Sequence, residues 1–364
     1  MTEPADRAEP DVLPTIYDVA RAAGVSIASV SRVLNDQRNP KPQTRERVLA
    51  AVAELGFAPD GAARALSARL KEVVGVIVRR SSQAENDLFI DEADSLQYPD
   101  LINRGIEVAA QRRGFDLLLR SVDIAEHDPG SRTLALARKS DGLILHDRVL
   151  EPGQLDRLAR RFPIVTLSGV PTANTANVRG DNTGGMRALA RHLLNDHGYC
   201  TLAYLSGYED SPDNIERQTA LAETVAGQAE LQTGPRWQGD YFASGGARVL
   251  RRLLKTDGPR ALPRAIICAN DQTALGVLAM LREHGIDVPG QVAVTGFDDT
   301  PMARHLHTSL TTVRQPIKQM GATAFEILYQ MIGGNRTGSH DVTLPTELII
   351  RESCGCQPGQ AGAR

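Results

Sequence analysis

The first sixty residues carry apolar side chains at helical spacing in three short stretches. From residue 16 to residue 23, apolar positions recur at intervals of three and four, which predicts one buried helix face. Thr15 precedes this stretch as a cap, and Asp18 lies in its first turn, where the helix dipole favours an acid. Gly24 permits a turn, and further helices are expected from Ser26 and from Thr44. Two short helices around a glycine turn predict a helix-turn-helix.

From residue 72 onwards the pattern changes to β-rich runs that alternate with amphipathic helical stretches. Strands are expected at residues 73–78, 115–119, 142–145, 163–167, 201–206, 265–269 and 292–296. Helices are expected between most of them, at residues 101–113, 184–195, 245–254 and 271–284. This alternation predicts parallel sheets flanked by helices, and its length predicts two lobes. The expected fold class is therefore an all-α helix-turn-helix head plus an α/β two-lobed core.

The composition is that of a soluble protein. Hydrophobic residues make up 41% and charged residues 23% of the 364 residues, as in ordinary globular proteins. The chain has no apolar run that could span a membrane, and its acidic start lacks the apolar stretch of a secretory signal. Its four scattered cysteines do not make a disulfide scaffold, so a reducing, cytoplasmic location is expected.

Charge is distributed unevenly along the chain. The formal net charge is −3, yet residues 15–71 hold nine Lys and Arg against five Asp and Glu. A short basic segment on an acidic body is expected of a head that reads DNA. The second helix of such a head enters the major groove with its first residues against base edges.

Several side chains of the second helix suit contacts to DNA. Ile27 and Ala28 can touch thymine methyl groups, and Arg32 can donate two hydrogen bonds to guanine. Other polar side chains suit phosphate contacts, which set register rather than sequence: Ser26, Ser31 and Asn35. The alternative is a three-helix packing module with no role at DNA.

Residues 15–35, TIYDVARAAGVSIASVSRVLN, resemble the signature of the LacI/GalR family of bacterial transcription regulators. The resemblance implies that Ile27, Ala28 and Arg32 read bases and that Tyr17 supports the helix pair. Thr15 and Tyr17 are included in the expected DNA-binding set. The implied partner is double-stranded operator DNA of near-palindromic sequence, bound by a homodimer with one head in each half-site.

Residues 59–70, PDGAARALSARL, resemble the hinge helix of the same family. The segment is too short to hold a helix alone in water, so ordering is expected only against DNA and a dimer mate. Leu66 matches the leucine that the family inserts into the central minor groove, where an apolar wedge kinks the duplex. The alternative is a plain linker with a buried leucine.

The rest of the chain resembles the periplasmic-binding-protein-like core of the family, in the blocks at residues 178–182, 268–276, 294–299 and 348–354. The expected domains are a disordered tail (1–14), the helix-turn-helix (15–57), the hinge (58–71), the core (72–353) and a tail (354–364). The resemblance implies lobe crossovers near Asn174, Thr308 and Asn335. Lobe 1 would then hold residues 72–174 and 309–335, and lobe 2 residues 175–308 and 336–353.

The cleft between two such lobes is the expected site of a small-molecule effector. Side chains that match the effector positions of the family are Arg217, Tyr241, Asn270, Asp298 and Gln315, and Tyr98 is a weaker candidate aromatic. Asn270 and Asp298 could instead cap the next helix or turn. Ser168 stands where many relatives carry an acid, which predicts an effector outside the common hexoses, though a sugar or sugar derivative remains the expectation.

No set of nucleophile, base and orienting group stands out, so no enzyme activity and no cofactor are expected. The His305 and His307 pair predicts a solvated loop, and Cys354 and Cys356 are interpreted as too isolated for a zinc site, so no metal is expected. The tail lacks a heptad repeat, which favours a dimer. The sequence thus predicts a DNA-binding transcriptional repressor modulated by an effector; the alternatives are a transport-type sugar-binding protein and a protein-interaction module.

Overall fold

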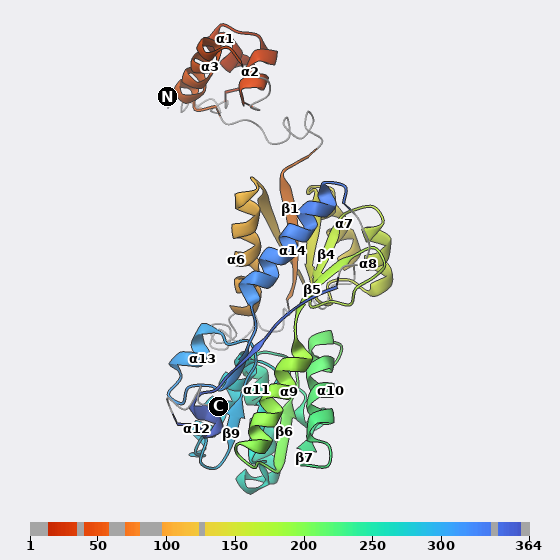
Figure 1. The fold of residues 1–364 in the computed structure, drawn as a ribbon, viewed down its shortest axis with the longest axis vertical. Coiled ribbons are helices and arrows are strands. Elements are labelled where there is room, and N and C mark those ends of the chain that lie inside the picture. The colour runs from red at the N-terminus through yellow and green to blue at the C-terminus, as the bar shows by residue number, and fades with distance from the viewer. Residues whose placement is uncertain are drawn as a thin grey trace, which may run out of the picture. The chain divides into compact units, whose positions relative to one another are not determined.

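The computed structural model describes residues 14–34, 40–57, 70–80, 97–123, 128–335 and 341–357. The chain divides into two compact units between Lys71 and Glu72, a small helical head and a larger α/β core (Figure 1). The candidate DNA contacts Asn35 and Leu66, the hinge residues 58–69, the segment 81–96 and the first thirteen residues lie outside the described residues.

The head consists of α1 (Ile16–Ala23), α2 (Ile27–Leu34) and α3 (Pro42–Leu55). Helix α1 begins after Thr15, whose N–H and hydroxyl donate to the Asp18 carboxylate at 2.9 and 2.7 Å. Gly24 adopts a left-handed φ of 60° at the end of α1, which permits the turn into α2. The three helices bury an apolar core with Val19, Val30 and Val48 at its centre, so the helix-turn-helix prediction is confirmed.

The first lobe of the core contains a six-stranded parallel sheet. Its order is β11 (Asp341–Leu344), β5 (Ala176–Gly180), β4 (Ile164–Leu167), β3 (Gly142–His146), β1 (Val73–Arg80) and β2 (Asp116–Asp123). One face packs on α6 (Gln97–Arg112) and α14 (Ile317–Ile332), and the other on α7 (Pro129–Ala137) and α8 (Pro152–Ala159). Burial on both faces explains why residues 73–78 of β1 and most residues of β3 and β4 are apolar.

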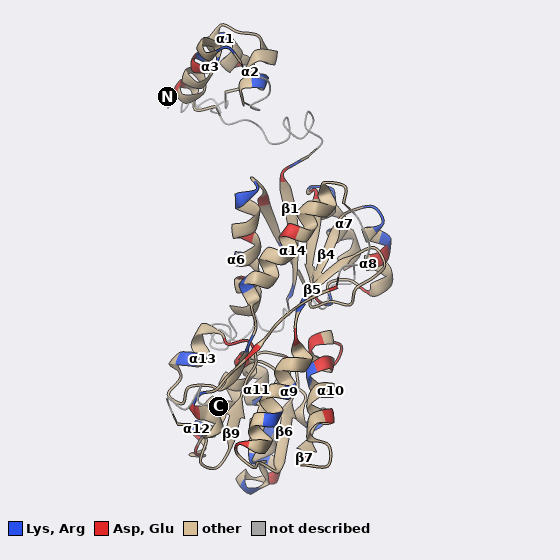
Figure 2. Cartoon of the chain, viewed as in Figure 1, with Lys and Arg blue, Asp and Glu red and all other residues tan. Residues whose placement is uncertain are grey.

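The second lobe contains a four-stranded parallel sheet in the order β7 (Glu230–Gln232), β6 (Thr201–Leu205), β8 (Ala265–Cys268) and β9 (Ala293–Thr295). Helices α9 (Asn182–Asn195) and α10 (Pro212–Val225) cover one face, and α11 (Ala243–Asp257) and α12 (Asp271–Glu283) the other. Charged residues lie mainly on helices and loops, whereas β4, β6 and β9 are free of them (Figure 2).

Smaller elements complete the core. Strand β10 (Thr312–Arg314) pairs antiparallel with β12 (Glu347–Ile349), and α13 (Pro301–His305) follows β9. Single helical turns occur at η2 (Pro235–Trp237), η3 (Pro259–Ala261) and η4 (Glu352–Cys354). The expected class, a helical head with a two-lobed α/β core of parallel sheets, is confirmed.

The lobe boundaries differ from the expected ones. Strands β5 and β11 belong to the first sheet, so the chain crosses after Gly180 rather than near Asn174, and again after Leu344 rather than near Asn335. The remaining crossing lies between β10 and α14 rather than near Thr308, because β10 pairs with β12 and bridges to β9. These strands are short and carry polar residues, so their sequence pattern does not stand out from a loop.

Candidate functional site

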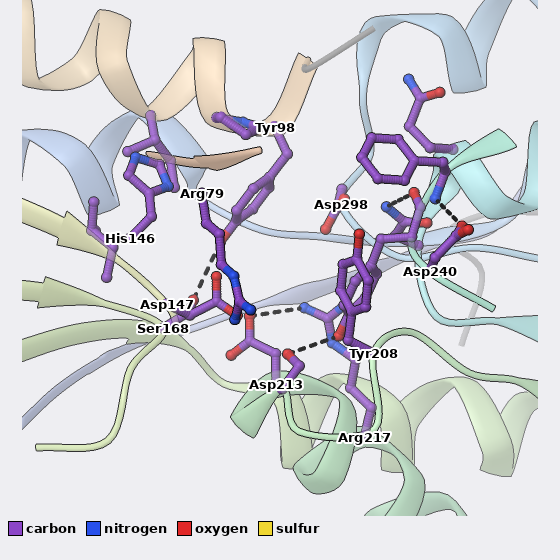
Figure 3. Close-up of a pocket in the computed structure, with 18 residues that line it drawn as sticks. Arg79, Tyr98, His146, Asp147, Ser168, Tyr208, Asp213, Arg217, Asp240 and Asp298 are labelled. Atoms are coloured by element: carbon purple, nitrogen blue, oxygen red, sulfur yellow. Dashed lines mark hydrogen bonds and ion pairs between the residues drawn. The ribbon is translucent and has the colours of Figure 1, made fainter. Parts of the chain in front are cut away.

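A pocket lies between the two lobes of the core, where the carboxyl ends of parallel strands face each other (Figure 3). Its volume is about 140 Å³, which leaves room for roughly ten water-sized groups, the size of one small sugar or base. Lobe 1 supplies Arg79, Tyr98, Pro99, Ile102, His146, Asp147, Leu167 and Ser168 to the lining. Lobe 2 supplies Tyr208, Ser211, Asp213, Arg217, Asp240, Tyr241, Phe242, Asn270, Gln272 and Asp298.

Arg217 is a buried cation held rigidly in the wall of the pocket. Its Nε donates to the Asn182 side chain at 2.8 Å and its Nη1 to the Ala269 carbonyl at 2.7 Å. Nη2 lies 3.6 Å from the Asp213 carboxylate, and the guanidinium lies 3.7 Å from the centre of the Phe297 ring. Burial opposes the charge, but Asp213 together with Tyr241, Asp298 and Tyr204 more than offsets this and raises the pKa of Arg217. The side chain is therefore permanently charged and oriented before any ligand binds.

Asp298 and Gln315 form a buried pair at the end of β9. The Gln315 amide donates to the Asp298 carboxylate at 2.8 Å. Burial raises the pKa of Asp298 to about 7, against the opposing effect of Arg217. Asp298 lines the pocket, whereas Gln315 is not among the lining residues and stands behind it. Gln315 thus positions the carboxyl group rather than facing the cavity, which differs from its expected place as an effector contact.

Asn270 serves the local fold and lines the pocket as well. Its side-chain oxygen accepts from the Thr273 N–H at 2.9 Å and from the Thr273 hydroxyl at 2.7 Å, so it caps α12. Its amide donates to the Tyr241 carbonyl at 3.0 Å, which anchors the loop that carries Tyr241. The capping role that the sequence left open for Asn270 is present in the structure.

Three tyrosines supply the aromatic surface of the pocket. Tyr98 comes from α6 of lobe 1, and its hydroxyl lies 3.4 Å from Ser168 Oγ (Figure 3). Tyr241 and Tyr208 come from lobe 2 with ring centres 5.8 Å apart, and the Tyr241 hydroxyl lies 3.1 Å from Ser211 Oγ. Such rings offer an apolar face beside polar groups, which suits a ligand with both kinds of surface.

Sequence reasoning missed several polar residues of the pocket. Arg79, Asp147, Asp213 and Asp240 all line it but lie in no motif that marks them. Arg79 lies near the carboxyl end of β1 and Asp147 directly after β3. Their position at the ends of predicted parallel strands, where ligands bind, could have indicated them. His146, also missed, is neutral at physiological pH because burial lowers its pKa to about 4.

The head presents the expected base-reading side chains on one exposed surface of α2. Ile27 is 41% exposed, and Ala28 and Arg32 are exposed as well. The Arg32 Nε donates to the Ala28 carbonyl at 3.1 Å, which holds the guanidinium along the helix. Tyr17 is 64% exposed, so its ring lies on the surface of α1 rather than supporting the packing of the helix pair as expected.

Two cysteines near the chain end are not isolated, as the sequence suggested. Cys354 is fully buried in η4, and it lies with Cys356 beside His192 and His197 from the end of α9. The spacing of 162 residues between His192 and Cys354 hid this neighbourhood in the sequence. The ordered packing also extends past residue 354, where the tail was expected to begin.

Comparisons with known proteins agree with this architecture. A profile described as "Bacterial regulatory proteins, lacI family" matches residues 15–60, and one described as "Periplasmic binding protein-like domain" matches residues 190–354. The transcriptional regulator GalS of Salmonella typhimurium is 32% identical, with 93% of this chain and 96% of GalS covered. The repressor PurR of Vibrio parahaemolyticus is 30% identical, with 94% and 98% covered.

Solved structures of similar proteins have the same fold. The Lac repressor dimer bound to operator and the anti-inducer ONPF has a TM-score of 0.77 and 25% identity, with 94% of this chain and 99% of that chain covered. The complex of the regulator CelR with cellobiose has a TM-score of 0.66 and 30% identity, with 93% and 99% covered.

A helix-turn-helix head joined to a periplasmic-binding-protein-like core defines a DNA-binding transcription regulator with a ligand-binding domain. The chain belongs to the LacI family of bacterial regulatory proteins. It is a DNA-binding transcriptional repressor with a ligand-binding domain, and the relatives named here are transcription regulators rather than enzymes. Among the helices that the structure describes, none combines the length and apolar character needed to cross a bilayer.

Proposed function

We propose that this repressor binds a near-palindromic operator as a homodimer and that a neutral sugar or sugar derivative in the interlobe pocket alters its operator affinity. The ligand class is inferred from the mixture of aromatic and hydrogen-bonding side chains that line the pocket. Its side chains pair aromatic rings with fixed hydrogen-bonding groups, as Arg217, Asp213 and Asp298 illustrate. Polyhydroxylated rings need both, since hydroxyls bond to charged side chains while the ring face packs on an aromatic.

The charges argue for a ligand without net charge. Four carboxyl groups line the pocket against two guanidinium groups, Arg79 and Arg217. Two of these carboxylates have other partners, because Asp147 pairs with Arg148 at 3.0 Å and Asp240 pairs with Arg248. Asp298 is partly protonated near neutral pH, because burial raises its pKa to about 7. The two guanidinium groups are also paired, Arg217 with Asp213 at 3.6 Å and Arg79 with Asp210 at 3.9 Å. An anionic effector would therefore have to displace a carboxylate to reach a cation, whereas a neutral effector would not.

The likeness to relatives supports the same ligand class. The CelR structure is a complex with the sugar cellobiose, and the Lac repressor structures contain the anti-inducer ONPF and ONPG. This chain has Ser168 in the pocket lining, hydrogen-bonded with Tyr98. Because that arrangement replaces an acid expected from the family pattern with a neutral hydroxyl pair, we expect the preferred sugar to differ from a simple hexose.

The ligand assignment is tested by thermal shift with a panel of neutral sugars, sugar acids and sugar phosphates. A neutral sugar should raise the Tm of the unaltered protein by mass action. Arg217→Lys should abolish that shift, because lysine cannot reproduce the two fixed hydrogen bonds to Asn182 and Ala269. The matched control is Arg187→Lys, on α9 and paired with Glu223 outside the pocket. A shift from anionic sugars alone would contradict the proposal.

The DNA assignment rests on the exposed surface of α2. Ile27, Ala28 and Arg32 are proposed to contact bases, with Ser26, Ser31 and Asn35 at phosphates and Leu66 in the minor groove at the operator centre. Thr15 and Tyr17 lie exposed at the start of α1 and complete the proposed contact set. Asn35 and Leu66 lie outside the described residues, so their roles rest on the family resemblance.

Arg32→Ala should weaken binding to an operator selected from random duplexes by about 1–3 kcal/mol, the value of one bidentate base contact. Binding to random DNA should persist, since phosphate contacts supply it. Fluorescence anisotropy on the selected operator and on a scrambled duplex measures both. The control is Arg21→Ala, an exposed arginine of α1 near Asp18, which should lower both affinities alike. Equal losses on both duplexes for Arg32→Ala would rule out base reading by this residue.

A further inference from the structure

Two histidines and two cysteines meet in the second lobe, far along α9 from the effector pocket. His192 lies in the last turn of α9, and His197 follows in the turn before β6. Cys354 is the last residue of η4, and Cys356 follows after Gly355. The four potential ligand atoms all lie within 4.8 Å of one another. We propose that these side chains form a tetrahedral Cys₂His₂ site for Zn²⁺ that fastens the C-terminal segment to α9.

The distances between the ligand atoms match such a site. His192 Nε2 lies 3.2 Å from His197 Nε2 and 3.4 Å from Cys354 Sγ. Cys356 Sγ lies 3.4 Å from His197 Nε2 and 3.8 Å from His192 Nε2. Tetrahedral zinc with its usual bond lengths places two nitrogens about 3.3 Å apart and a nitrogen and a sulfur about 3.6 Å apart. The measured distances between the ligand atoms are therefore close to those of a tetrahedral zinc site before any ion is added.

A neighbouring carboxylate orients one of the ligands. Asp196 Oδ2 lies 2.8 Å from His192 Nδ1, so that nitrogen carries the proton and Nε2 keeps its lone pair toward the cluster. A histidine that binds a metal commonly donates its other N–H to a carboxylate in this way. Two imidazole Nε2 atoms at 3.2 Å repel if both present lone pairs, and a cation between them removes that repulsion.

Tyr199 contacts the backbone of Cys354 and the ring of His197 and so holds these two ligand residues in place. The Tyr199 hydroxyl donates to the Cys354 carbonyl at 2.7 Å, and its ring stacks on the His197 ring with centres 5.0 Å apart. The Arg264 guanidinium also lies over the ring of Tyr199, 4.7 Å from its centre. Tyr199 thus contacts both sequence segments that supply ligands, and it positions them without being a ligand itself.

The donor set identifies the metal class and its role. Thiolates and imidazoles select zinc over magnesium or calcium, which require oxygen ligands. Four protein ligands leave no open position for water or substrate, which is typical of structural rather than catalytic zinc. The ligand pairs are separated by more than 150 residues, counted from the 162 between His192 and Cys354, so an ion would close a long loop and restrict the unfolded chain.

The test is the zinc content of the full-length protein, purified under reducing conditions and measured by mass spectrometry of the metal. The expected result is about one Zn²⁺ per chain, and a Co²⁺-substituted sample should show thiolate charge-transfer absorption of tetrahedral cobalt. Cys356→Ser and His197→Gln should each lose the metal; both positions are partly exposed and less prone to misfold than Cys354. The matched controls are Cys200→Ser and His305→Gln, exposed residues outside the cluster, which should retain it.

Stability gives a second readout that does not depend on DNA or effector binding. Removal of the metal with a chelator should lower the Tm by roughly 5 °C or more, and added Zn²⁺ should restore it. Neither change should occur in Cys356→Ser. Three results would each overturn the proposal. The first is a metal-free protein whose Tm does not change when Zn²⁺ is added, and the second is equal zinc content in the cluster variants and the controls. The third is a Cys354–Cys356 disulfide in protein purified under reducing conditions.

Discussion

Asp298 shows how a single buried carboxyl group couples the pocket to pH. It lines the cavity together with Arg217 and Asp213, and its side chain accepts a hydrogen bond from Gln315. Burial raises its pKa to about 7, whereas an aspartate in an unfolded chain titrates near pH 4. Between these two values the folded protein binds a proton that the unfolded chain has lost. The folded state is therefore favoured at the acid end of this window and loses stability as the pH rises through it.

Replacing Asp298 by asparagine should reduce this pH dependence. In the unaltered protein, one such proton changes the free energy of unfolding by at most about 1.4 kcal/mol per pH unit. Asp298→Asn cannot titrate, so its free energy of unfolding should fall less steeply between pH 5 and pH 7. Chemical denaturation at several pH values measures the slope. An unchanged slope would show that the carboxyl titrates near its ordinary pKa in the folded protein.

Most of the candidate effector residues were predictable because a family motif contained them, and Tyr98, the weaker candidate, also lines the pocket. Arg217, Tyr241, Asn270 and Asp298 match family positions, and the structure places them all around one cavity. Gln315 also matches, but it stands behind Asp298. The other polar pocket residues from lobe 1, such as Arg79 and Asp147, lie at or just after strand ends and in no motif, and they meet lobe 2 only through tertiary folding. The Cys and His cluster was missed for the same reason.

At the scale of elements, the long helices and buried strands were predictable and the short strands were not. The seven strands expected from apolar runs are all present, and six of them are buried over most of their length; the exception is β2, an edge strand with exposed leucines. Strands β5, β7, β10, β11 and β12 have three to five residues and include polar ones. They exist because a distant partner strand supplies their hydrogen bonds, and local sequence carries little information about that partner.

Helices α6 and α14 show a close approach that depends on glycine. A Cβ atom at Gly105 would clash with the backbone carbonyl of Lys318, and one at Gly321 with the carbonyl of Ile102. Backbone atoms cannot rotate away as side chains can, so the helices would have to separate. The glycines therefore set the distance between the two helices that cover one face of the first sheet.

Gly105→Ala should destabilise the protein by about 1–3 kcal/mol, as overpacking does elsewhere. The control is Gly153→Ala in α8, where the added methyl would meet only the flexible side chain of Arg157 at ordinary contact distance. That change should be neutral or slightly stabilising, because alanine favours helix. Urea unfolding followed by circular dichroism compares the two. Equal stability of both variants would mean that α6 and α14 adjust without cost.

At the scale of the whole molecule, strand β2 presents an unusual surface for a single chain. It forms one edge of the first sheet, and two of its leucines, Leu118 and Leu119, are 38% and 56% exposed. Exposed apolar side chains on an edge strand mark a surface that another chain can cover. A regulator that reads two half-sites needs a second copy, so we expect this edge to contribute to the homodimer.

Leu119→Glu should therefore weaken the dimer, because pairing would bury the introduced charge without a partner. Sedimentation velocity should show more monomer than for the unaltered protein at the same concentration. Operator affinity should fall with it, since two separate heads lose the advantage of binding adjacent half-sites together. The control is Val170→Glu, which replaces an apolar residue of similar exposure, 54%, in the loop between β4 and β5. Dissociation of both variants alike would assign the effect to added charge, whereas dissociation of Leu119→Glu alone locates the interface at β2.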